Sequence, residues 1–168
     1  MSEFGVSSEA PADREDARLL RIVLDGPALT RLSPALEADR EQAMADLAFE
    51  SNFAPVGFIG PFVLHLAIAE GRLVFDIRDQ DDQKLIAHVL ALGPFRSLIK
   101  DYQMLVDSYL ISVHEGFEER IQAIDMGRRG LHNEGAEMMV SRLKGKIIID
   151  FSTARRLFTL VCLLHQRI

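Results

Sequence analysis

The sequence is poor in the residues and runs that mark several common protein classes. Its 168 residues include one cysteine, Cys162, and no tryptophan. A single cysteine excludes an internal disulfide framework and any zinc site built on several cysteines. No apolar run reaches the roughly 18 residues that a membrane span needs, and residues 1–16 lack the basic and apolar regions of a secretory signal. We therefore expect a reduced, cytosolic protein without a membrane contact.

The short motifs of the large enzyme classes are also missing. The chain contains no GxxxxGKS/T phosphate loop, no GxGxxG after a strand, no GxSxG elbow and no HExxH metal motif. The acidic run at residues 79–82 lacks the alternating ligands and the central glycine of a calcium loop, and is better interpreted as a solvated turn. We expect no cofactor and no metal.

Positive charge is scarce over most of the chain and concentrated near its end. The formal net charge is −6, which disfavours a protein that coats nucleic acid. Residues 126–168 nevertheless hold eight Lys/Arg and three Asp/Glu, a net +5, so the remainder carries −11. Two interpretations stay open: the basic end packs on the acidic part of its own chain, or it forms an anion or nucleic-acid surface. Few aromatic residues accompany these charges, so nucleic acid has weak support as a partner.

Length and patterning predict one α+β domain. Residues 1–17 are small, polar and acidic and are predicted to form a disordered tail, which leaves residues 18–168 as the domain. Apolar periodicity and Gly/Pro breaks predict the order β-α-β-β-β-α-α-β-α, in which an antiparallel meander packs against helices. The strands are expected near 19–24, 62–68, 73–77, 85–92 and 146–149, and residues 52–61 as a loop.

One predicted helix, from residue 118 to about residue 144, contains three glycines. Gly127, Gly130 and Gly135 each cost about 1 kcal/mol against alanine in a helix interior. Either the helix is broken here, or its backbone closely approaches another group. The same helix carries the densest set of chemically capable side chains in the chain.

On that helix, an acid, a guanidinium and an imidazole recur at one-turn spacing. Arg128 and His132 are four residues apart and share a face, and Asp125 precedes Arg128 by about one turn. Arg128 and Arg129 offer forked donors for phosphate or carboxylate, and His132 can exchange a proton near neutral pH. Glu134 or Asp125 is placed to orient the histidine. The competing interpretation is a structural network that joins helices.

Two further arginines, Arg155 and Arg156, fall at the start of the last predicted helix. Cations there oppose the helix dipole unless an anion or an acidic side chain lies nearby. We therefore expect a partner for them, either inside the protein or outside it. The candidate anion- or partner-binding set is Arg128, Arg129, His132, Glu134, Arg155 and Arg156.

Other candidates have less support. His65 and His88 lie on predicted strands near Asp76, but no ligand spacing supports a metal. Cys162 lies in an apolar helix and is expected to be an inert core thiol. The stripe formed by Tyr102 and Tyr109 is expected to belong to the core.

Four segments resemble a known protein family: residues 93–96, 124–135, 145–147 and 153–160. They are similar to those of a small family of unknown function from alpha-class proteobacteria, and the resemblance extends over roughly residues 18–165. It implies a bacterial cytosolic protein, and it implies no activity, cofactor or catalytic residue. A second and weaker resemblance is to the helical HEPN ribonuclease-type domains, which cut RNA without metal. Their arginine and histidine are separated by four to six residues, whereas three separate Arg128 from His132, and the predicted strands are foreign to that all-helical fold.

Two functions remain at this point. The favoured one is a non-enzymatic interaction or regulatory module that uses the Arg/His/Glu surface of the glycine-rich helix, with a protein partner or a phosphate-bearing ligand. The alternative is a metal-independent enzyme that acts on RNA or a phosphorylated small molecule. In the enzyme, His132 would be the acid or base, and Glu134 or Asp125 would orient it.

Overall fold

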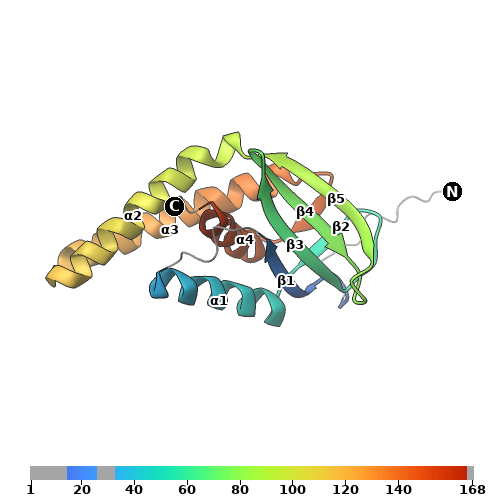
Figure 1. Cartoon of the computed structure of the whole chain (residues 1–168), viewed down its shortest axis with the longest axis horizontal. Helices are drawn as coiled ribbons and strands as arrows, with labels where there is room; N and C mark the ends of the chain where they lie inside the picture. Colours follow the sequence, from blue (N-terminus) through green and yellow to red (C-terminus); the bar gives the residue numbers. More distant parts are fainter. Residues whose placement is uncertain (1–14, 26–32, 166–168) are drawn as a thin grey trace.

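The computed structural model describes residues 15–25 and 33–165 of the chain. Within them the elements follow the order of Figure 1. The strands are β1 (Leu19–Asp25), β2 (Phe53–Pro55), β3 (Phe62–Ala69), β4 (Arg72–Arg78), β5 (Lys84–Ala91) and β6 (Ile147–Ile149). The helices are α1 (Pro34–Phe49), the 3₁₀ turn η4 (Gly93–Phe95), α2 (Arg96–Glu115), α3 (Glu118–Arg142) and α4 (Phe151–Leu164).

The main sheet has the strand order β1-β3-β4-β5. Strands β3, β4 and β5 form the predicted antiparallel meander, and β1 adds to β3 in parallel. The β3–β4 connection is the two-residue turn of Glu70 and Gly71, both at positive φ (52° and 74°), a geometry that matches the twist of paired strands. The predicted α+β class is confirmed, with the finding that the sheet is mixed.

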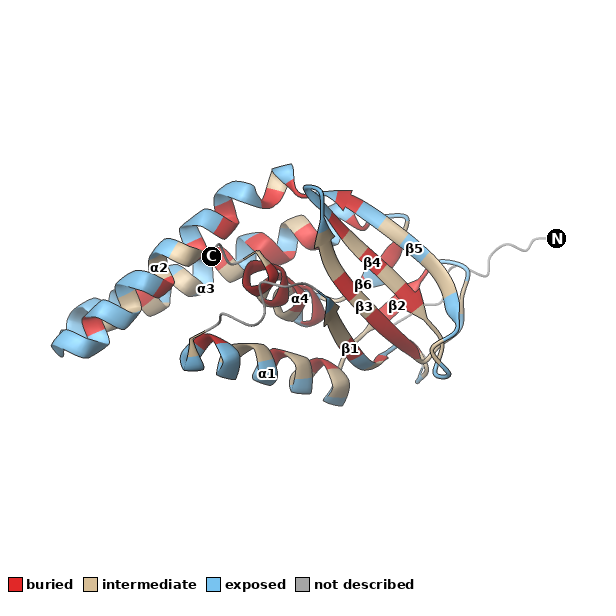
Figure 2. Ribbon diagram, viewed as in Figure 1, coloured by how far each residue is buried: buried red, intermediate tan, exposed pale blue. Residues whose placement is uncertain are grey.

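The core lies between the sheet and the helices. Along β4 the side chains of Leu73, Phe75 and Ile77 are fully buried and their neighbours are not, as strand alternation requires. Helix α4 packs against α1, α2 and α3, and Figure 2 shows it buried on nearly all sides. Its Asp150 cap accepts the N–H of Thr153 at 2.9 Å, as a carboxylate at a helix N-terminus typically does.

The sequence pattern predicts that the segment 52–61 is a loop, and this prediction is wrong for its first part. It contains β2, which pairs antiparallel with β6 so that Phe53 lies opposite Ile149. A three-residue strand that includes Pro55 is too short to show periodicity. Its backbone partner lies almost 100 residues further along the chain, so no local signal identifies it.

Helix α3 is unbroken from Glu118 to Arg142 despite its glycines. The explanation is close approach at Gly135, where an added Cβ would overlap the ring of Phe158 on α4. Gly127 faces the end of Leu105, whereas a Cβ at Gly130 would meet open space. One glycine therefore permits tight packing of α3 on α4, and the turn at Gly116 (φ 78°) ends α2.

Residues 1–14 of the predicted tail, and the Gly26-Pro27 break, lie outside the described residues. At the start of the described part, Ala17 is buried and its carbonyl accepts the N–H of Phe53 at 2.9 Å. Within residues 15–25 and 33–165, no helix has both the length and the apolar character needed to cross a membrane.

Candidate functional site

The structure divides the candidate residues of α3 into an inward and an outward group. Arg128 and His132 are partly buried and contact neighbouring helices, whereas Arg129 and Glu134 are exposed. Residues four apart on a helix share a face, and adjacent residues diverge by about 100°. The set proposed from the sequence therefore does not form one continuous surface.

Arg128 joins α3 to α1 and to α2. Its Nη2 lies 3.5 Å from a carboxylate oxygen of Asp39 on α1. Its guanidinium carbon lies 5.8 Å from the ring centroid of Tyr109 on α2, within the range of a cation–π contact. Burial raises the pKa of Asp39, and the Arg128 charge only partly opposes that effect.

His132 lies between α2 and α4. Its Nε2 is 3.2 Å from the hydroxyl of Thr159, and that hydroxyl also donates to the carbonyl of Arg155. A hydroxyl has one proton to donate, so the histidine Nε2–H is the donor to Thr159. The ring also lies beside Tyr102 and Phe158, with centroids 5.6 and 6.2 Å away.

The surroundings keep His132 uncharged at neutral pH. Burial, followed by the charges of Arg128 and Arg155, lowers its pKa from 6.5 to about 4. Among the described residues the ring bonds to Thr159 rather than to Glu134 or Asp125. An imidazole with so low a pKa is a poor acid or base at pH 7.

The paired arginines of α4 have different surroundings. Arg156 Nε lies 3.8 Å from Asp46 on α1, and its Nη1 donates to the carbonyl of Glu50 at 3.4 Å. Arg155 Nε is buried and lacks a hydrogen-bond partner within the described part of the chain. Together, Arg128 and Arg156 pair the basic C-terminal part of the chain with acids of α1, as the first of the two charge interpretations predicts.

Two surface hollows lie along the second half of α3. One, of about 440 Å³, is lined by Glu134, Glu137, Ser97, Ser141 and Arg142 and lies between α2 and α3. The other, of about 640 Å³, is largely apolar and is lined by Val140, Ile148 and Phe151 beside β6. His132 lines neither of these two hollows, whereas Glu134 lines the one between α2 and α3.

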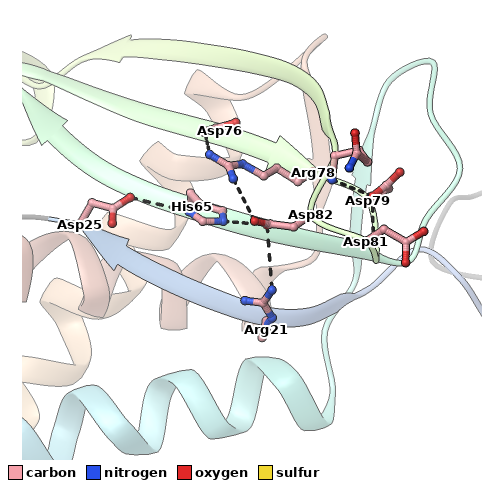
Figure 3. A network of polar contacts seen from close by, with 9 residues as sticks. Arg21, Asp25, His65, Asp76, Arg78, Asp79, Asp81 and Asp82 are labelled. Atoms are coloured by element: carbon pink, nitrogen blue, oxygen red, sulfur yellow. Dashed lines mark hydrogen bonds and ion pairs between the residues drawn. The ribbon is translucent and has the colours of Figure 1, made fainter.

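A second polar cluster, of which the sequence indicated only His65 and Asp76, lies on the face of the sheet opposite to that of Phe75 (Figure 3). His65 Nε2 donates to Asp82 at 3.0 Å and its Nδ1 lies 3.7 Å from Asp25, while Arg78 binds Asp76 and Asp82 at 2.9 and 3.0 Å. The hydrogen bond from His65 and the charge of Arg78 lower the pKa of Asp82 against the opposing effect of burial. The signal in the sequence was the acidic turn that follows β4, but its partners are set by strand register.

The other minor candidates are also placed. His65 lies opposite Asp76 and His88 opposite Phe75, so the two histidines occupy opposite faces of the sheet. No cluster of three or more His, Cys, Asp or Glu suited to a metal occurs in residues 15–25 and 33–165. Cys162 is fully buried, and burial raises the pKa of its thiol. Tyr102 is buried in the core, whereas Tyr109 is partly exposed.

The free ends of α2 and α3 project beyond α1 and α4, as Figure 1 shows. Large apolar side chains are exposed along this part of the helical hairpin, where Figure 2 is mostly pale blue. Met126 is 71% exposed, Met104 58% and Ile111 55%. We call the following residues the hairpin surface, which extends around more than one side of the two helices: Met104, Ile111, Val113, Phe117, Met126 and Arg129.

Fold and charges together define a class: a single α+β domain in which arginines of α3 and α4 pair with acids of α1 and whose helical hairpin projects from the core. The chain belongs to the Uncharacterised protein family (UPF0262), whose model matches residues 16–167.

Its relatives are proteins of alpha-class proteobacteria, as the sequence resemblance predicted. A UPF0262 protein of Granulibacter bethesdensis is 64% identical over 167 residues, which cover 94% of this chain and 95% of that protein. One of Acidiphilium cryptum is 59% identical over 155 residues, or 89% and 93% of the two chains. One of Rhodospirillum rubrum is 47% identical over 154 residues, or 92% and 96%. No solved structure matches the chain significantly.

Proposed function

We propose that the protein is a non-enzymatic, cytoplasmic interaction module that binds a protein partner on the hairpin surface. The exposed apolar side chains of the projecting hairpin carry this proposal. Monomeric proteins rarely leave large apolar side chains grouped on one projection, because each contact with water is costly. A partner that wrapped around the hairpin and covered Met104, Ile111 and Met126 would remove that cost.

In this proposal the charged residues have two roles: some contact the partner, and others hold the helices in place. Arg129 is exposed on α3 three residues after Met126 and supplies polar contacts beside the apolar centre, as in the polar rim of known interfaces. Glu134 is also exposed but lies further along α3, in the hollow that Ser97 lines, and contacts a partner that extends that far. Arg128, His132 and Arg156 hold α3 and α4 against the rest of the domain through Asp39, Thr159 and Asp46. They fix the direction in which the hairpin projects.

The enzyme alternative has less support from the same geometry. An uncharged, partly buried His132 bonded to Thr159 is poorly suited to proton transfer at pH 7. Two of the four candidate arginines already have acidic partners on α1, which leaves fewer guanidinium groups for a phosphate. The buried thiol of Cys162 suits a reducing compartment, in keeping with the cytoplasm.

The test is affinity purification with matched surface variants. Tagged protein is incubated with a low-salt extract of Granulibacter bethesdensis, which contains a 64% identical relative, and bound proteins are identified by mass spectrometry. The hairpin variant carries Ile111→Asp and Met126→Asp. The control is Phe49→Asp on α1, where the side chain is 89% exposed and remote from the hairpin.

We expect a companion that binds wild type and the Phe49→Asp control and is lost from the hairpin variant. With the purified companion, the variant should bind at least about tenfold more weakly, or about 1.4 kcal/mol, because interface anchors carry most of the affinity. Circular dichroism melts check that both variants are folded. A hairpin variant that retains every companion, or a wild type that binds none, would refute the proposal.

A further inference from the structure

Strand β5 ends the main sheet, and within the described residues β4 is its one neighbour in that sheet. The N–H of Leu92 donates to the carbonyl of Gly71 at 3.1 Å, which sets the alternation of the β4–β5 ladder. At steps of two, His88 and Leu90 also bond toward β4. The backbone N–H and C=O groups of Ala87 and Val89 therefore point to the free edge.

Beyond Lys84 and the irregularity in register at Leu85, residues 86–91 of this edge lack the devices that usually protect the edge of a sheet. Charged side chains, prolines or a covering helix normally block pairing with another strand. At the opposite edge, β1 carries the charged Arg21 and Asp25 and packs against α1. By contrast, β5 carries one formal charge, Lys84 at its start, and has no proline or glycine. Ala87 and Val89 are both exposed.

We propose that this edge binds β5 of a second copy of the chain, antiparallel, about a twofold axis at His88. In this register Ile86 lies opposite Leu90 of the other copy, and Ala87 lies opposite Val89. Both residues of each pair are apolar, and the two side chains of a pair lie on the same face of the sheet. Lys84 falls beyond the paired residues, so no like charges meet.

A second copy is the favoured occupant for two reasons. The strand is complementary to itself, as an isologous twofold interface requires, and antiparallel pairing continues the order of β3, β4 and β5. The two His88 side chains that meet at the axis are uncharged at pH 7, because burial and the nearby Lys146 both lower the pKa of His88. This inference does not depend on the hairpin surface, which lies on other elements.

The first experiment removes one free-edge donor without touching the β4–β5 ladder. In Val89→Pro the lost N–H faces solvent in the monomer, a position at which sheets tolerate proline. Sedimentation equilibrium measures mass against concentration for wild type, for Val89→Pro and for the Ile111→Asp/Met126→Asp hairpin variant. We expect wild type and the hairpin variant to rise from 18.8 kDa toward twice that mass, and Val89→Pro to stay at 18.8 kDa.

A second pair of variants tests the register and remains informative if Val89→Pro unfolds. Because Ala87 lies opposite Val89 of the other copy, Ala87→Lys with Val89→Lys sets like charges across the interface. Ala87→Lys with Val89→Glu sets opposite charges there. We expect the first double variant to dimerise at least about tenfold more weakly than the second.

Three results would overturn the inference. One is a wild-type mass that stays at 18.8 kDa up to about 1 mM protein. Another is a dimer that survives in folded Val89→Pro but is lost in the hairpin variant, which would place a second copy on the hairpin instead. The third is equal dimerisation of the two lysine-containing double variants, which would exclude the register centred on His88.

Discussion

Two glycine-to-alanine substitutions in one helix should change stability in opposite directions. Gly130 and Gly135 both lie in the interior of α3, so alanine gains about 1 kcal/mol of helix propensity at either position. An added Cβ at Gly130 has no heavy atom within 4 Å, whereas one at Gly135 would overlap the ring of Phe158. The gain in helix propensity is common to the two variants, whereas only Gly135→Ala adds an overlap with a side chain of α4.

The size of the difference follows from packing. Phe158 is fully buried, and the overlap involves the base of its ring rather than a flexible end, so α3 and α4 must move apart. Overpacking of this kind costs about 1–3 kcal/mol. Gly130→Ala should therefore gain up to about 1 kcal/mol, and Gly135→Ala should lose up to about 2 kcal/mol. For a chain of this length each kcal/mol shifts the midpoint of thermal unfolding by about 2–4 °C.

Urea unfolding followed by circular dichroism measures both variants beside wild type. The slope of unfolding free energy against urea should be the same for all three, because the surface exposed on unfolding hardly changes. Gly127→Ala, whose Cβ would lie 3.4 Å from the mobile end of Leu105, should fall between the other two. A Gly135→Ala protein as stable as Gly130→Ala would refute the close approach of α3 to α4.

Two further predictions concern pH. In wild type the unfolded chain binds a proton at His132 below about pH 6.5, but the folded protein resists it until about pH 4. The free energy of unfolding should therefore fall by up to about 3 kcal/mol as the pH drops between those values. His132→Gln should remove this part of the pH dependence, which urea unfolding at pH 7 and pH 4.5 would measure. An equal loss of stability in the two proteins between these pH values would contradict the prediction. Asp150→Ala should cost about 1–2 kcal/mol at pH 7 through loss of the α4 cap. The hydrogen bonds from Thr153 and Asn52 lower the pKa of Asp150 against the effect of burial. The difference in stability between wild type and Asp150→Ala is therefore complete above about pH 4 and becomes smaller in stronger acid. A difference that grew in acid would contradict this prediction.

Local signals predicted the elements whose causes are local. Ser33 caps α1 by accepting the N–H of Leu36, Glu70 and Gly71 form the β3–β4 turn, and Gly116 ends α2. Each of these depends on side-chain chemistry or backbone freedom within about four residues. The strands predicted at 62–68 and 73–77, on either side of the turn, accordingly agree with β3 and β4 within one residue at each end.

The partners of the candidate site could not be predicted in the same way. Arg128 pairs with Asp39, and His132 bonds to Thr159 on a different helix. Such contacts depend on how elements pack, and periodicity shows which residues share a face but not which face meets which. The sequence correctly placed Arg128 and His132 together on one face of α3, and the use of Arg129 and Glu134 in binding stays a prediction.

The position of α4 at the centre of the helices has a consequence for how the chain folds. This helix follows every other helix and strand in the described sequence, yet it packs against α1, α2 and α3. Asn52 also depends on this last segment for its hydrogen bonds: Thr153 accepts its backbone N–H, and Asp150 accepts from its side-chain amide at 2.7 Å. A nascent chain can form its meander and its hairpin early. The apolar side chains that pack on α4 in the folded protein stay exposed until α4 has been synthesised. Folding should therefore be completed only after synthesis of α4, and the growing chain must be kept from aggregating until then.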